Sequence, residues 1–224
     1  MANDLSVLII GGNRFPFHRF DRVGPQLADA LNEHGIETTL TTDRDELSAL
    51  NEYDVVLDYM TDSTLEEKQL DGLLTFVETG GGYVGLHCAA DLSSTASDDP
   101  DELIDAREEP VPELRELLGG YFHTHPAQTT FDVRVTDSHH PVTAGMEDVT
   151  VWDEPYDVSV DSDDVRVLAR MDHPDLGDTP VVWVRKHGDG RVCYCSLGHT
   201  DAALSDGGVQ QLLRRGVGWA GGAD

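Results

Sequence analysis

Residues 80–90 read GGGYVGLHCAA, and this stretch indicates the fold more clearly than any other part of the chain. The apolar run 83–86 is short and continuous, which is typical of a parallel strand covered on both faces. His87 follows it directly. Because ligands of open α/β sheets collect at the carboxyl ends of the strands, His87 stands where a reactive side chain is expected. A histidine that only caps the strand is the alternative interpretation.

Apolar strands and helices alternate on the N-terminal side of this stretch. Residue Thr64, with Glu67 three positions later, forms a capping-box pattern that predicts the start of a helix. The order strand, helix, strand, strand, helix, strand indicates a doubly wound α/β sheet. The predicted strands are 5–10, 36–40, 54–57 and 83–86, and the predicted helices run from about 23 to 34 and from 64 to 77.

The C-terminal side is expected to add antiparallel strands. Residues 91–111 are acidic and almost free of apolar side chains, which predicts a surface loop. Residues 131–135 alternate apolar and polar, as half-buried strands do. We therefore expect one domain with a core of residues 5–221. Further strands are predicted at 149–152, 158–160 and 165–169, a hairpin at 181–184 and 191–197, and helices at 112–118 and 209–220.

The charge of the chain excludes some classes of partner. The 224 residues carry 43 Asp and Glu against 15 Lys and Arg, a formal net charge of −28. Such a surface repels phosphate backbones and anionic lipids, so neither nucleic acid nor a membrane is an expected partner. The acidic residues are spread over the whole chain, as in halophilic proteins that work in concentrated salt. A small-molecule partner is expected, and a homo-oligomer is compatible with the sequence.

This charge predicts that stability rises with salt. Self-repulsion destabilises a compact acidic protein in dilute buffer, and molar salt shortens its reach to about 3 Å. We expect the midpoint of thermal unfolding to be higher in molar KCl than in dilute buffer. An unchanged midpoint would contradict the halophilic interpretation.

The cysteines and the N-terminus suggest a cytoplasmic protein. Cys193 and Cys195 are two positions apart on a predicted strand, so they point the same way and bridge poorly. Cys88 adds a third, unpaired thiol. Residues 7–10 are too short an apolar run for a signal peptide or a membrane span.

Five of the ten histidines follow predicted strands or lie in the loop after the 80–90 stretch. In a doubly wound sheet, His18, His87 and His199 would emerge at the same edge. Neutral imidazoles bind metals and also transfer protons near neutral pH. The candidate metal ligands are His18, His87, His123, His125 and His199, and the candidate ion is Zn²⁺ or another borderline divalent cation.

The chain resembles the ThuA-like, or trehalose-utilisation, family. The resemblance is carried by GGGYVGLH at 80–87, GGYFHTHP at 119–126, HPVTAGM at 140–146, DEPY at 153–156 and GRVCYCSLGH at 190–199. It implies a class I glutamine-amidotransferase-like fold, a flavodoxin-like three-layer sandwich whose sheet is mainly parallel. It also implies a carbohydrate-like or keto-sugar ligand.

The resemblance places a histidine where amidotransferases of this fold have their cysteine nucleophile. His87 occupies that elbow, and Cys88 comes one residue later. A shift of one residue turns the side chain away from the pocket, so glutamine hydrolysis is not expected. Imidazole can act as an acid or base, or bind a metal, but it is a poor acyl carrier.

These residues leave two classes of function open. The first is a sugar-active enzyme, whether hydrolase, lyase or isomerase, and the second is a non-catalytic sugar-binding or small-molecule-binding domain with an inherited pocket. Asp153 and Glu154 could instead form an acidic turn held by Tyr156. The expected catalytic residues are His87, His199 and Glu154, and the expected substrate-binding residues are Asn13, His18, His123, His125, Asp153, Tyr156 and Asp201.

Overall fold

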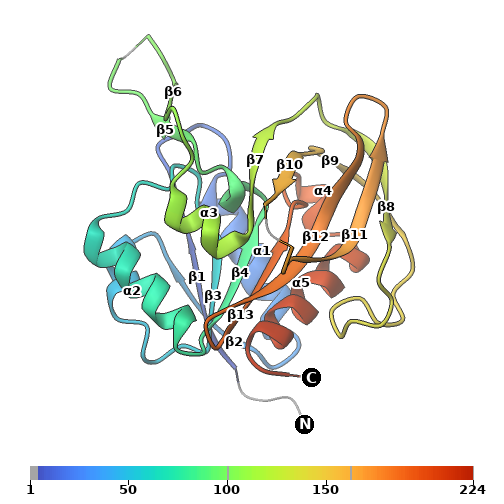
Figure 1. Cartoon of the computed structure of the whole chain (residues 1–224), viewed down its shortest axis with the longest axis horizontal. Coiled ribbons are helices and arrows are strands. Elements are labelled where there is room, and N and C mark those ends of the chain that lie inside the picture. Colours follow the sequence, from blue (N-terminus) through green and yellow to red (C-terminus); the bar gives the residue numbers. More distant parts are fainter. Residues whose placement is uncertain (1–4, 100, 162, 224) are drawn as a thin grey trace.

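The computed structural model of the chain describes residues 5–99, 101–161 and 163–223. A nine-stranded mixed sheet forms its centre, in the order β2-β1-β3-β4-β13-β12-β11-β8-β9 (Figure 1). From β2 to β13 neighbouring strands are parallel, and from β13 to β9 they are antiparallel. The strands are β1 (Ser6–Gly11), β2 (Glu37–Thr41), β3 (Val55–Tyr59), β4 (Gly82–Leu86), β8 (Thr129–Val135), β9 (Val149–Asp153), β11 (Arg166–His173), β12 (Gly177–His187) and β13 (Gly190–Cys195).

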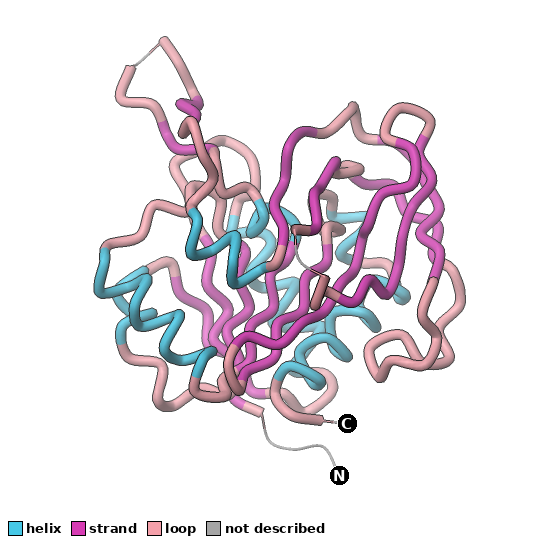
Figure 2. The backbone as a smooth tube through the Cα atoms, in the orientation of Figure 1, coloured by secondary structure: helices cyan, strands magenta, loops and turns pink. Residues whose placement is uncertain are grey.

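Helices cover both faces of the sheet, which makes three layers (Figure 2). The side chains of β1 alternate: Val7 and Ile9 join the core beneath α1 and α5, whereas Leu8 and Ile10 join the core beneath α2 and α3. The central strands β1, β3 and β4 are therefore covered on both faces, as predicted for residues 83–86, whereas the edge strand β2 is largely exposed. One face carries α1 (Phe20–Asn32), α4 (Asp201–Leu204) and α5 (Gly207–Ala220), and the other carries the 3₁₀ turn η1 (Arg44–Ser48), α2 (Glu67–Glu78) and α3 (Pro112–Leu118).

The start of α2 differs from the prediction. The helix begins at Glu67, and its capping contact joins the Gln69 side chain to the backbone N–H of Glu66 at 2.9 Å. Thr64 is not the cap: its hydroxyl donates to Asp62 at 2.6 Å and accepts from the Arg107 guanidinium at 2.5 Å. A threonine cap must accept from a backbone N–H of the first turn, and here tertiary contacts engage the hydroxyl instead.

The acidic segment was expected to be a loop, but it contains a hairpin that projects from the body of the molecule (Figure 1). Strands β5 (Ser94–Ala96) and β6 (Ile104–Ala106) pair with each other and with no strand of the main sheet. The base of the hairpin is held by Asp62, which accepts from the Thr95 hydroxyl at 3.0 Å. A second small sheet pairs β7 (Gly120–Thr124) with β10 (Asp157–Val160).

None of the helices in the described ranges is long and apolar enough to cross a bilayer.

Asp58, on β3, carries a buried carboxyl that gives a testable pH dependence. It accepts from the Tyr83 hydroxyl at 2.7 Å and from the Met60 N–H at 2.7 Å. Burial raises the pKa of Asp58 to about 6, although both hydrogen bonds oppose the rise. The folded state therefore holds this proton more tightly than the unfolded chain, whose Asp pKa is about 3.9. Ionisation of Asp58 costs stability above pH 6, and the cost vanishes below about pH 4.

We expect Asp58→Asn to stabilise the protein at pH 8 by roughly 2–3 kcal/mol and to have little effect near pH 4. The amide keeps an acceptor for Met60 and can donate to the Tyr83 oxygen. Denaturant unfolding at both pH values measures the difference. Asp54→Asn, at the exposed position directly before the same strand, is the control. Equal effects of Asp58→Asn at pH 4 and pH 8 would contradict the assignment.

Candidate functional site

The turn after β4 holds His87 in an uncommon backbone conformation. The strand passes directly into the 3₁₀ turn η2 (His87–Ala90), and His87 has φ +46°, in the left-handed region. Non-glycine residues rarely adopt this conformation unless the surroundings hold it, and such residues cluster at functional sites. Here the Tyr194 hydroxyl donates to the His87 carbonyl at 2.8 Å. The imidazole is fully buried, and its Nδ1 lies 2.8 Å from the Ser196 carbonyl oxygen.

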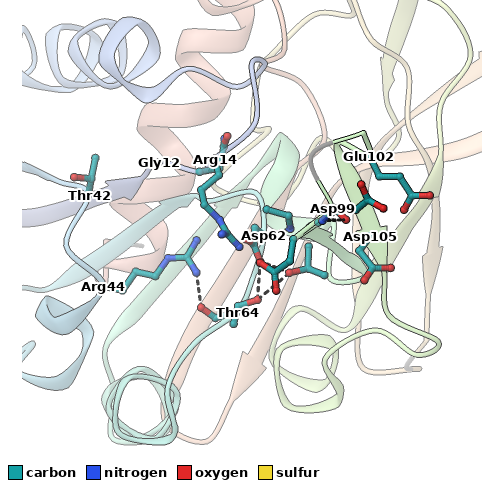
Figure 3. Close-up of a pocket in the computed structure, with 14 residues that line it drawn as sticks. Gly12, Arg14, Thr42, Arg44, Asp62, Thr64, Asp99, Glu102 and Asp105 are labelled. Carbon is teal, nitrogen blue, oxygen red and sulfur yellow. Dashed lines mark hydrogen bonds between the residues drawn. The ribbon is translucent and has the colours of Figure 1, made fainter.

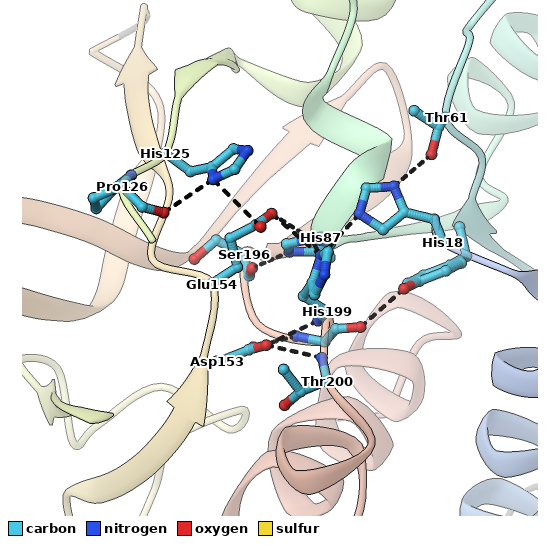
Figure 4. Close-up of polar contacts among 12 residues, drawn as sticks. His18, Thr61, His87, His125, Pro126, Asp153, Glu154, Ser196, His199 and Thr200 are labelled. Carbon is cyan, nitrogen blue, oxygen red and sulfur yellow. Dashed lines mark hydrogen bonds and ion pairs between the residues drawn. The ribbon is translucent and has the colours of Figure 1, made fainter. Parts of the chain in front are cut away.

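The loop after β13 is held by Asp153, the last residue of β9. Its carboxylate accepts from the backbone N–H groups of Gly198, His199 and Thr200 at 2.7–3.0 Å. The Tyr59 hydroxyl donates to the Gly198 carbonyl at 2.9 Å. These contacts leave the His199 ring directed toward His87 (Figure 4).

The loop after β1 supplies a third imidazole. His18 has φ +50°, and its Nδ1 lies 2.8 Å from the Thr61 hydroxyl (Figure 4). The Asn13 amide donates to the His18 carbonyl at 3.3 Å and to the Thr61 hydroxyl at 3.4 Å. Asn13 and Thr61 therefore set the direction of the His18 ring.

Four potential ligand atoms converge within 4.8 Å of one another, from His18, His87, Glu154 and His199. His199 Nδ1 lies 3.1 Å from His18 Nε2, 3.2 Å from His87 Nε2 and 3.2 Å from Glu154 Oε2. Glu154 Oε2 is 3.6 Å from His87 Nε2. Ligand atoms placed tetrahedrally at zinc distances lie about 3.3–3.6 Å apart. Four of the six pairs in this cluster, at 3.1–3.6 Å, are close to that spacing, and the other two lie within 4.8 Å.

The protons of the cluster are too few to satisfy its donors and acceptors. Because a carbonyl only accepts, Nδ1 of His87 must donate to Ser196, and Nε2 faces the cluster. Burial, together with the neighbouring His87 and His199, lowers the pKa of His18 to about 2, so the His18 ring is neutral and carries a single proton. Wherever two lone pairs face each other at this distance they repel, and a cation between them would remove the repulsion.

Glu154 supplies the negative charge of the cluster. Burial alone would raise the pKa of its carboxyl, but the hydrogen bond from His199 and the neighbouring His87 imidazole hold that pKa well below its usual range. In turn, Glu154 raises the pKa of His199 although burial opposes this. The other carboxylate oxygen, Oε1, lies 3.3 Å from Nδ1 of His125, a half-exposed residue. Glu154 thus joins the buried imidazoles to a histidine that solvent can reach.

The sequence profile of a family described as trehalose utilisation, ThuA, matches residues 6–220, nearly the whole chain. The chain belongs to the ThuA family. A search of curated proteins finds no match.

Solved structures similar to this ThuA-family chain share its fold. A protein of Bacteroides uniformis described as ThuA-like has 23% identity and a TM-score of 0.75, with 98% of this chain and 92% of that one covered. A β-galactosidase of Bacillus circulans has 14% identity and a TM-score of 0.67, with 97% of this chain and 30% of that one covered.

A third structure links the fold to amidotransferases. A Thermoplasma acidophilum protein described as part of a GMP synthase has 12% identity and a TM-score of 0.58, with 97% of this chain and 94% of that one covered. The α/β fold, with a parallel core and added antiparallel strands, therefore resembles class I glutamine-amidotransferase-like domains, as the sequence predicted.

The cysteine that follows the elbow residue His87 in this ThuA-family chain is not exposed for attack on a substrate. Cys88 is fully buried, and burial raises the pKa of its thiol well above the usual range. Nucleophilic cysteines need a thiolate in a partly exposed, electropositive setting. The placement of Cys88 agrees with the prediction that it points away from the pocket.

The structure does not bring all the expected site residues to the cluster. His123 is exposed and hydrogen-bonds to the Ser159 hydroxyl, and Asp201 pairs on the surface with Arg22 at 2.5 Å. Asp153 and Asn13 touch the loops of His199 and His18 rather than the four converging atoms. Tyr156 stacks on the His87 ring, with the ring centroids 4.1 Å apart.

Sequence reasoning missed Thr61, Tyr194 and Ser196, which orient the imidazoles. A signal existed for Thr61, because it follows β3 as His18 follows β1. The other two lie in the predicted strand 191–197, where nothing in the sequence distinguishes a residue that contacts His87 from one that only packs.

Proposed function

We propose that this ThuA-family protein binds a divalent cation such as Zn²⁺ through His18, His87, His199 and Glu154 and acts on a carbohydrate or keto-sugar. One observation carries the proposal: four potential ligand atoms from four separate segments converge within 4.8 Å of one another. Three imidazoles and a carboxylate suit a borderline ion.

The chemistry of such a site follows from its parts. A divalent cation there would polarise a sugar carbonyl or hydroxyl oxygen, or activate a water molecule. His125 and Glu154, 3.3 Å apart, can pass a proton between solvent and the cluster. Tyr156 covers one face of His87 and keeps water from that side. Hydrolase, lyase and isomerase chemistry all remain compatible with these residues.

The carbohydrate part of the proposal is supported by the comparisons. The matching family is described as trehalose utilisation, and one protein with a similar domain is a β-galactosidase. The reactive position at the elbow is a histidine, and Cys88 is buried, which argues against glutamine amidotransferase activity.

A second candidate, a non-catalytic sugar-binding or small-molecule-binding domain, is favoured by the same geometry. Structural zinc sites are closed by four protein ligands, whereas catalytic zinc sites keep an open position. Here the protein already offers four potential ligand atoms, enough to close a tetrahedral site, and His87 is fully buried. Activity would then require Glu154 to leave the ion, with His125 as its alternative partner.

Elemental analysis of protein purified without a histidine tag tests the cation. About one equivalent of a divalent metal per chain is expected, removed by a chelator and restored on adding Zn²⁺. A protein that contains no stoichiometric metal as purified, and binds none when Zn²⁺ is added, would overturn the proposal. Turnover of a panel of keto-sugars and glycosides by the loaded protein separates the enzyme from the binding domain.

The proposal extends to the cellular location and the partners of the protein. Cys88, Cys193 and Cys195 are buried and unpaired in the structure, which agrees with a reducing cytoplasm. A partner of sugar-like chemistry fits the proposed reaction, and a chain with a net charge of −28 is not expected to bind nucleic acid or anionic membranes. The same charge supports a halophilic protein.

A further inference from the structure

A polar cavity with a volume of about 1040 Å³ lies beside the histidine cluster (Figure 3). Its walls are the segments that follow β1, β2 and β3, together with the β5–β6 hairpin. The carboxyl ends of parallel strands are where α/β proteins bind ligands. Asn13 connects the two places: it lines the cavity and also donates to the His18 carbonyl at 3.3 Å.

Two guanidinium groups point into this cavity without a carboxylate partner (Figure 3). Among the described residues, Arg44 donates to the backbone carbonyls of Thr61 and Thr64 and forms no ion pair. Arg14 has no hydrogen-bond or ion-pair partner among the residues that the structure describes. In a chain with 43 Asp and Glu against 15 Lys and Arg, carboxylates are abundant, and most other arginines pair with one.

The nearest carboxylate, Asp62, is already compensated. It lies 3.7 Å from the Arg107 guanidinium and accepts from the Thr64 and Thr95 hydroxyls at 2.6 Å and 3.0 Å. The backbone N–H of Ala96 adds a longer contact of 3.4 Å. Asp62 attracts the Arg44 guanidinium, but it forms no ion pair with Arg14 or Arg44 among the described residues, so both guanidinium groups keep donors for an anion.

The opposite wall of the cavity has the other polarity. The hairpin contributes four carboxylates there: Asp98, Asp99, Glu102 and Asp105. Carboxylates accept hydrogen bonds from hydroxyl groups but repel anions. A ligand that fills the cavity must accordingly carry negative charge at one end only and hydroxyl groups at the other.

We infer that the cavity binds a sugar that carries one anionic group, a phosphate or a carboxylate. Arg14 and Arg44 bind the anion through charge-assisted hydrogen bonds, and the hairpin carboxylates accept from the sugar hydroxyls. The volume is ample for a monosaccharide. The sugar part of this inference rests on the proposed function, whereas the anion part stands on the two arginines alone.

Calorimetric titration tests the inference, with the same KCl concentration throughout. The probes are inorganic phosphate, a hexose phosphate, a hexuronate and the neutral hexose. The variant is Arg14→Gln, which breaks no contact of the described fold. Arg214→Gln is the control: it makes the same change of charge on α5, away from the cavity.

We expect the wild type to bind an anionic sugar more tightly than the neutral hexose, and Arg14→Gln to weaken that binding about tenfold or more. Arg214→Gln should bind as the wild type does. Tighter binding of the hexose phosphate identifies a phosphate ligand, and tighter binding of the hexuronate identifies a carboxylate.

The inference is overturned if no anionic probe binds the wild type, or if Arg14→Gln and Arg214→Gln bind alike. Anion binding that a chelator abolishes but Arg14→Gln does not change would place the anion on the metal, which overturns the inference and supports the proposed function. Conversely, Arg14-dependent binding in a protein that takes up no metal supports the inference and overturns the metal site.

Discussion

His87→Gln and His199→Gln should each lower the metal content to below about a tenth of the wild type. Changing a residue that merely orients a ligand typically costs 10–100-fold in metal affinity, and these substitutions remove a ligand atom itself. Turnover of any sugar substrate should fall in parallel, because metal and activity are lost together. Metal analysis and activity assays on the same preparations measure both.

Cys88→Ser is the matched control, since Cys88 is the neighbour of His87 on the same buried turn but contributes no atom to the cluster. We expect it to keep its metal. Glutamine variants that retain full metal but lose turnover would assign proton transfer, not metal binding, to the imidazoles, with a loss of about 10²–10⁴-fold. Loss of metal in Cys88→Ser alone would mean that the wrong residue has been placed at the site.

Asp153→Ala should destabilise the fold by at least about 3 kcal/mol. The carboxylate is fully buried and accepts from three consecutive backbone N–H groups, which the alanine variant leaves without their partner. Because these groups shape the loop that carries His199, metal content should fall as well. Denaturant unfolding and metal analysis provide the two measurements.

Two further variants serve as comparisons for the loss of stability expected from Asp153→Ala. Asp153→Asn keeps one acceptor oxygen, so an intermediate loss is expected. Asp201 lies three residues after Gly198 but pairs with Arg22 on the surface, where ion pairs contribute little to stability. Asp201→Ala should therefore cost little stability. A loss from Asp201→Ala as large as that from Asp153→Ala would refute the role assigned to Asp153.

The parallel half of the sheet could be read from residues that are close in sequence. In β1, Val7 to Ile10 form one continuous apolar run because the strand is buried on both faces. This pattern can be recognised without knowing which strands lie beside β1. The turn at His87 was likewise marked by its place directly after such a run. The convergence of His18, His87 and His199 then followed from one rule, that parallel strands end at the same edge.

Contacts between distant segments were harder to predict. Thr64 satisfies a capping pattern but bonds to Asp62, and the 91–111 segment, which looks like a loop, contains a hairpin tied to the same aspartate. His123 and His125 look alike in sequence. Only the pairing of β7 with β10 turns the first toward Ser159 and leaves the second beside Glu154.

The order of strands and helices in the parallel half, its two-sided core and the histidines at strand ends follow from the sequence, because they depend on local periodicity and on the alternation of side chains along a strand. Strands β5, β6 and β7 and helix α4 were not predicted, and folding contacts settle which side chains are potential ligands and which support them. Asp153 ends β9 and Glu154 is the first residue after it, yet the Asp153 carboxylate binds the backbone of the His199 loop, whereas the Glu154 carboxylate faces the imidazoles. Arg14 and Arg44 likewise line one cavity only because the segments after β1, β2 and β3 meet in the folded chain.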